Sequence, residues 1–128
     1  GGFAVLKDVS KTWVYRLSKY RNSLGRVIPE RIITRPPSAE LKPDQTDQDS
    51  LPPYDVLDAI MACYVEKNKS IGEIVKLGYA EADVRRVVKL IRIAEYKRRQ
   101  APVGVRITDR SFGKDWLYPI TVRYQDQF

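Results

Sequence analysis

The residue types that this sequence lacks limit the chemistry open to it. It contains no histidine and one cysteine, Cys63, among 128 residues. A Ser-His-Asp triad, a Cys-His pair, a disulfide within the chain and an ordinary His/Cys zinc site are therefore excluded. Cys63 lies in an apolar run with Ile60, Met61 and Tyr64, where a free cysteine is typically a small buried residue. The candidates for chemistry that remain are charged side chains that bind a ligand.

Basic side chains dominate these candidates. The chain carries 23 Lys and Arg against 16 Asp and Glu, a formal net charge of +7. The excess lies near both ends, because residues 36–60 carry one lysine against six carboxylates. A basic protein of this kind favours a polyanionic partner, but the acidic segment would interrupt a continuous track of phosphates.

One basic region has the outline of a helix-turn-helix DNA reader. A short capped helix after Ser70, a turn at Gly78 and a basic helix from Glu81 to about Arg99 follow in that order. In this interpretation six side chains would contact DNA, in the groove or at phosphates: Arg85, Arg86, Lys89, Lys97, Arg98 and Arg99. The alternative is two packed helices with a solvated basic face. Asn, Gln, Ser and Thr, which commonly read base edges, are absent from 84–92.

The elements that must position these residues are mainly helical. The spacing of four apolar residues predicts an amphipathic first helix, with Asp8 or Ser10 as its N-cap and an end at Gly25: Trp13, Leu17, Tyr20 and Leu24. Pro29 is placed to begin a short helical turn. Residues 36–52, rich in proline and carboxylates, predict a flexible acidic loop. No start methionine opens the chain, and we expect a piece of a longer protein.

Residues 53–100 form the predicted helical region. A helix runs from Pro53 to about Lys67, Ser70 and Glu73 form a capping box, and an apolar stripe predicts one long helix from Glu81 to about Arg99. Residues 101–128 have aromatic residues without helical period and predict an extended tail that packs across another surface. The length of 128 residues leaves room for a single unit, and its apolar runs are too short to cross a bilayer.

Three ordered motifs resemble one enzyme family. Arg-Pro-Pro-Ser-Ala-Glu-Leu at 35–41 is similar to the pattern [K/R]-x-P-[S/T]-A-[D/E]-L, Leu-Pro-Pro-Tyr-Asp-Val-Leu-Asp at 51–58 to L-P-x-Y-x-x-L-D, and Glu-Tyr-Lys-Arg-Arg-Gln-Ala-Pro at 95–102 to E-[H/Y]-K-R-x-x-x-P. These patterns belong to the NAD synthetases, whose segment after a Gly-Asp turn also resembles residues 1–12. The tail at 112–120 is similar to the glutamine-dependent members.

The resemblance implies a fold and a reaction. The chain would be the C-terminal helical subregion of an α/β adenine-nucleotide α-hydrolase-like (Rossmann-like) synthetase domain in a cytoplasmic, homo-oligomeric carbon-nitrogen ligase. Such enzymes use ATP and Mg to adenylylate deamido-NAD, and glutamine-derived ammonia then displaces AMP to give NAD. The family's Ser-Gly-Gly-x-Asp-Ser loop and its glutaminase domain do not occur in this sequence. The chain alone is therefore expected to be inactive. Neither a membrane nor a specific nucleic acid is expected among its partners.

The resemblance also implies site residues, each with a plainer alternative. Lys11, Ser38 and Arg35 match positions that contact ATP or its phosphates, and Lys97 matches the lysine that contacts deamido-NAD, beside Tyr96 where many members have histidine. Without a ligand, Lys11 would be a solvent lysine, Ser38 a turn hydroxyl and Lys97 part of a charged helix end. Residues 35–50 are expected to order over ATP. A nucleic-acid-binding module and a packing or oligomerisation element are the competing functions.

Overall fold

The chain folds into six α-helices and one π-helical turn in the part that the structure describes. The computed structural model describes residues 2–35 and 51–121. Ser38 and the acidic loop predicted over 36–52 lie outside this range, apart from residues 51 and 52. Within the described residues there is no β-sheet, only an isolated parallel bridge between Phe3 and Val103. The prediction of a mainly helical chain is confirmed.

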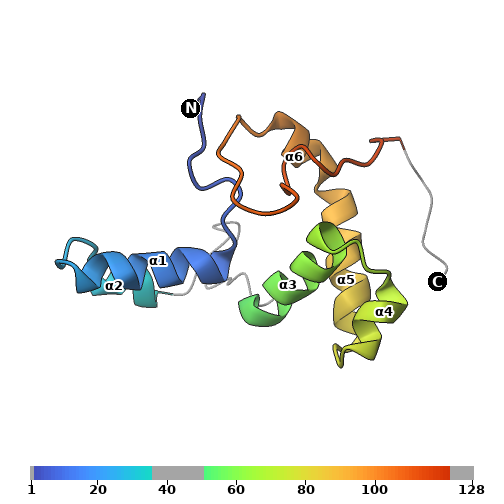
Figure 1. Ribbon diagram of the computed structural model, residues 1–128, viewed down its shortest axis with the longest axis horizontal. Helices are drawn as coiled ribbons and strands as arrows, with labels where there is room; N and C mark the ends of the chain where they lie inside the picture. Colours follow the sequence, from blue (N-terminus) through green and yellow to red (C-terminus); the bar gives the residue numbers. More distant parts are fainter. Residues whose placement is uncertain (1, 36–50, 122–128) are drawn as a thin grey trace, which may run out of the picture.

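Helices α1 (Lys11–Ser23) and α2 (Glu30–Thr34) form an arm beside the remaining helices (Figure 1). The side chain of Asn22 closes the turn between them, because its Oδ1 accepts from the Val27 and Ile28 amides and its Nδ2 donates to the Ile28 carbonyl. Pro29 occupies the N-cap position of α2, so the predicted short helical turn begins one residue after it. The predicted apolar stripe of α1 does not enter the core: Trp13, Leu17, Tyr20 and Leu24 are 44–66% exposed.

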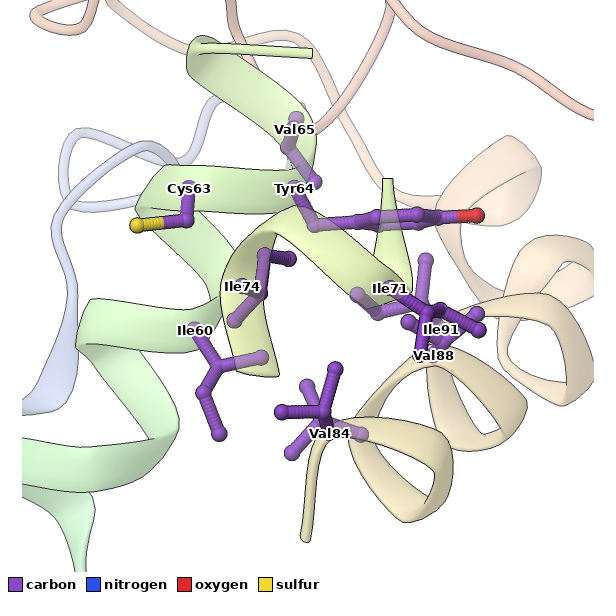
Figure 2. Close-up of a cluster of buried hydrophobic side chains, with 10 residues drawn as sticks. Ile60, Cys63, Tyr64, Val65, Ile71, Ile74, Val84, Val88 and Ile91 are labelled. Carbon is purple, nitrogen blue, oxygen red and sulfur yellow. The ribbon is translucent and has the colours of Figure 1, made fainter. Parts of the chain in front are cut away.

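The core lies between the last turns of α3 and the helices that follow it. Helix α3 (Tyr54–Met61) widens into the π-helical turn η2 (Ala62–Glu66), so one helical segment covers the predicted range, and α4 (Ile71–Lys76) and α5 (Glu81–Ile93) pack against it. Figure 2 shows the apolar side chains of the core, which come from the continuous α3–η2 segment, from α4 and from α5. The buried side chains of this hydrophobic core are Ile60, Cys63, Tyr64, Val65, Ile71, Ile74, Val84, Val87, Val88 and Ile91. Cys63 is a buried core residue, as expected.

The capping box at α4 is formed as predicted. The Ser70 hydroxyl accepts from the Glu73 amide, and the Glu73 carboxylate accepts from the Ser70 amide at 2.8 Å. Replacing Ser70 with alanine is expected to lower the free energy of unfolding by about 1 kcal/mol, because the first turn of α4 loses a partner for its free amides. Thermal unfolding with Ser23→Ala as the control tests this. Ser23 donates to Tyr20 at the end of α1 and caps no helix N-terminus.

The predicted single helix from Glu81 to Arg99 is wrong, because it is broken at Ala94. Helix α5 ends at Ile93 and α6 spans Glu95–Gln100, with Ala94 at φ −77° and ψ 0° between them. The apolar stripe of α5 would continue at Glu95, a carboxylate that is only 3% exposed. At this point the packing changes from apolar side chains to a buried ion pair with Arg98.

The tail after α6 turns back along the beginning of the chain (Figure 1). The Ala4 amide donates to the Val103 carbonyl at 2.8 Å, and the Lys7 ammonium donates to the Pro102 carbonyl at 2.6 Å. Farther along, Trp116 packs edge-on against Tyr64, whose hydroxyl lies 2.6 Å from that of Tyr118. Between residues 101 and 121 the tail has no regular helix.

Candidate functional site

Lys11 is an exposed ammonium at a place where two helices begin. It is the first residue of α1, and its Nζ lies 5.9 Å from the ring centroid of Tyr54, the first residue of α3. The amino ends of helices carry partial positive charge and free amide donors. The arrangement therefore favours an anion near Lys11. The Asp58 carboxylate already binds one amide of this turn, that of Thr12, and a phosphate is the further anion that the resemblance implies.

The N-terminus of α1 is capped differently from the prediction. Ser10 occupies the N-cap position, but its side chain accepts no capping hydrogen bond, and Asp8 points to the tail. The Thr12 amide instead donates to the carboxylate of Asp58 at 2.9 Å. A carboxylate 46 residues away replaces the local cap because α3 lies beside α1, a placement that no local pattern encodes.

The basic residues of α6 divide into two groups. Lys97 and Tyr96 are exposed, and the Lys97 Nζ lies 6.0 Å from the centroid of the neighbouring ring. Arg98 is buried and binds Glu95 and the carbonyls of 112 and 116, while Arg99 donates to the carbonyl of Tyr118 at 2.7 Å. In the helix-turn-helix interpretation Arg98 and Arg99 would contact DNA phosphates, whereas in the structure both guanidiniums donate to carbonyls of the tail. In α5, Arg85 pairs with Glu81 at 2.7 Å.

Of the other two predicted ATP contacts, Arg35 and Ser38, only Arg35 lies in the described part of the chain. Arg35 is exposed at the C-cap of α2, where its amide donates to the Arg31 carbonyl. Ser38 lies outside the described residues. Four predicted residues are thus on the surface of three helical segments, and none of them lines the large groove described next.

A groove of about 1060 Å³ lies between the first residues of the chain, α1, α3 and the tail. Its wall carries large apolar side chains that remain 44–63% exposed: Val5, Leu6, Trp13, Leu17, Val105 and Ile107. Arg16, Asp55 and Glu66 are among the charged residues that also line it. Apolar surface gathered in this way is typical of an interaction site, and it includes Trp13 and Leu17 from the apolar stripe of α1.

Asp8 is a buried carboxylate, although its place in the sequence predicts only a possible N-cap of the first helix. It is 7% exposed and accepts from the Ile107 amide, the Thr108 amide and hydroxyl, and the Phe112 amide at 2.7–3.2 Å. Burial alone would raise the pKa of Asp8, but the hydrogen bonds, led by those from Thr108, hold this pKa below its ordinary value of 3.8. The folded chain therefore favours the charged carboxylate.

The stability that Asp8 contributes is expected to depend on pH. Because its pKa is lower in the folded chain, this contribution is present above pH 3.8 and is lost as the pH falls through the folded pKa. The difference in free energy of unfolding between the wild type and Asp8→Asn should be largest near neutral pH and shrink in acid. Urea titrations at several pH values measure it, with Asp109→Asn, an exposed tail carboxylate, as the control. A difference that is constant from pH 7 to pH 2 would contradict this assignment.

The described residues contain neither a cluster of side chains suited to a metal ion nor a helix suited to a membrane. Within residues 2–35 and 51–121, no group of three or more His, Cys, Asp and Glu side chains could hold a metal. The Mg that the resemblance implies therefore does not fit these residues by themselves. No helix in this part of the chain is long and apolar enough to cross a membrane.

Comparisons with known proteins agree on one family. A family model described as NAD synthase matches residues 1–101. The chain is 55% identical over 124 residues to a glutamine-dependent NAD(+) synthetase of Aquifex aeolicus, covering 97% of the chain and 22% of that protein, and 57% identical over 122 residues to one of Acinetobacter baylyi, covering 94% and 23%.

A solved structure is also similar. It is a glutamine-dependent NAD+ synthetase from Acinetobacter baumannii in complex with ADP, 48% identical, with a TM-score of 0.53 over 94% of this chain and 20% of that one. The chain thus spans less than a quarter of the length of these relatives, while nearly all of its own residues match them.

Proposed function

This chain belongs to the NAD synthase family, and we propose that it is the C-terminal part of a glutamine-dependent NAD synthetase. The proposed reaction is the ATP-dependent amidation of deamido-NAD to NAD with glutamine-derived ammonia, releasing AMP and pyrophosphate. The observation that carries the proposal is the identity of 55% to such a synthetase over 97% of the chain. The chain alone is proposed to be inactive, because it has no Ser-Gly-Gly-x-Asp-Ser loop.

The chain's proposed contribution to the reaction is to bind substrates. Lys11 would neutralise charge on the ATP phosphates, since its exposed ammonium lies where α1 and α3 begin. Arg35 would assist with its planar guanidinium at the end of α2. Lys97 and Tyr96, both exposed on α6, would contact deamido-NAD. A positive charge fixed before the phosphates arrive stabilises the negative charge that develops as pyrophosphate leaves.

The apolar groove supports the proposal of a longer enzyme. Trp13 is 52% exposed and Leu17 is 44% exposed, although both lie on the apolar face of an amphipathic helix. Such a face is normally covered. We propose that the remaining synthetase polypeptide covers it, because more than three quarters of the length of each relative described above lies outside the match.

A chimeric enzyme tests the proposed function. The segment of the Acinetobacter baylyi synthetase that matches this chain would be replaced by the chain itself, and NAD formation from deamido-NAD, ATP and glutamine would be measured. We expect the chimera to form NAD and the same enzyme without the segment to form none. A folded chimera that hydrolyses glutamine but forms no NAD would contradict the proposal.

A substitution in the groove tests whether the remaining synthetase polypeptide covers this apolar surface. Leu17→Asp is expected to lower the unfolding temperature of the chimera, because a carboxylate would be buried at the contact, while the isolated chain should unfold at nearly the same temperature as the wild type. Leu24→Asp is the matched control, since Leu24 lies on the same stripe but does not line the groove. Thermal unfolding of the chimera and of the isolated chain gives the two readouts. Equal behaviour of the two variants in the chimera would count against this contact.

A further inference from the structure

We propose that Asp8 is a positioning residue for Lys11, through which the tail at 107–112 holds the phosphate-binding end of α1. The inference rests on the proposed function and concerns how Lys11 is kept in place. It assigns to the tail a part in ATP binding, although the described tail contributes no residue to the proposed ATP contacts.

The first step is that Asp8 joins two distant parts of the chain. All four of its hydrogen bonds come from one short stretch of the tail, and the shortest is from the Thr108 hydroxyl at 2.7 Å. The donors are about 100 residues later in the sequence. A buried carboxylate with four donors has a single well-defined position, because any displacement breaks strong charge-assisted hydrogen bonds.

The second step is that the neighbouring residue, Lys7, is enclosed by the same tail. Its aliphatic chain passes so close to Gly104 and Gly113 that a Cβ added at either glycine would come within 2.7 Å of it. Its ammonium donates to the Pro102 carbonyl at 2.6 Å. Residues 7 and 8 are thus held by side-chain packing on one side and by hydrogen bonds on the other.

The third step connects this anchor to Lys11. Only two residues separate Asp8 from Lys11, and the next amide, that of Thr12, is fixed by the Asp58 carboxylate. The backbone of Lys11 is therefore held on its N-terminal side by the tail and on its C-terminal side by α3. Its side chain remains exposed, so the position of the ammonium depends on these two anchors. A shift of about 1 Å in such a group can cost up to a hundredfold in rate.

The test uses the chimeric synthetase described above. Asp8→Asn is expected to lower kcat/KM for ATP about tenfold, a smaller loss than in Lys11→Ala, since the ammonium is misplaced and not removed. Thr108→Val, which removes one donor at nearly constant volume, should give a smaller loss and keeps the test valid if Asp8→Asn does not fold. Asp115→Asn is the matched control, because its carboxylate accepts from the Ser111 amide within the tail and does not touch residues 7–11.

A double variant separates positioning from a general structural role. In a Lys11→Ala background, Asp8→Asn should change kcat/KM for ATP by less than about twofold, because the residue through which it acts is gone. Multiplicative losses in the double variant would overturn the inference while leaving the proposed function intact. If Lys11→Ala alone had no effect in an active chimera, the inference would also be overturned. A chimera that folds and forms no NAD would instead contradict the proposed function itself.

Discussion

Replacing Arg98 with alanine is expected to lower the free energy of unfolding of the chain by about 3–5 kcal/mol, the cost of leaving a buried charge unpaired. Arg98 and Glu95 are 7% and 3% exposed and form a buried ion pair. The guanidinium also donates to the Phe112 carbonyl at 2.9 Å and the Trp116 carbonyl at 3.1 Å, and lies 4.6 Å from the Phe112 ring centroid. Its loss therefore removes the buried partner of the Glu95 carboxylate and the donors to two carbonyls.

The tail should come loose first in this variant. Trp116 packs between Tyr64 and Tyr118, so near-ultraviolet circular dichroism and tryptophan emission report the detachment. Arg99→Ala is the matched control, because Arg99 also contacts Glu95, at 3.3 Å, but its side chain is 41% exposed. The control should lose roughly 1 kcal/mol or less. A loss in Arg98→Ala no larger than in the control would show that the buried pair does not hold the tail.

Lys11→Ala should reduce kcat/KM for ATP about 10²-fold in the chimeric synthetase. The exposed ammonium at the beginning of α1 and α3 is proposed to bind the ATP phosphates, and removing one preorganised group at a site of developing charge costs about 10²–10³ in rate. Steady-state ATP titration measures the loss. Lys19→Ala, on the same helix and also exposed, is the control and should leave the value nearly unchanged. An unchanged kcat/KM for ATP in Lys11→Ala would make Lys11 an ordinary surface lysine.

These two variants separate the structural from the chemical use of basic residues in this chain. Arg98 is buried, has its charge satisfied by the protein, and should affect stability. Lys11 is exposed and should affect catalysis with little change in unfolding temperature. The helix-turn-helix interpretation treated the basic residues of 81–99 as one surface. Since Arg98 and Arg99 bind the tail and Arg85 pairs with Glu81, that surface has fewer charges available for a polyanion.

The helix ends, the turns and the family can be predicted from the amino-acid sequence alone. Helix starts at Ser70 and after Pro29, the turn at Gly78 and the buried stripe of α5 follow from interactions within a few residues, which a sequence pattern records directly. The motifs at 35–41, 51–58 and 95–102 point to the NAD synthase family because all three occur in the family's order along one chain.

Which charged side chains are buried and bound by distant segments is visible only in the tertiary structure. Asp8 looked like a local cap and instead accepts hydrogen bonds from Thr108 and its neighbours, while Asp58 caps a helix 46 residues away. Arg98 looked like part of a basic surface and is buried beside Glu95. A charge near a helix end has the same local pattern whether water or a distant segment satisfies it, and the free energy that selects between them comes from contacts made when the tail and α3 pack against α1 and α6.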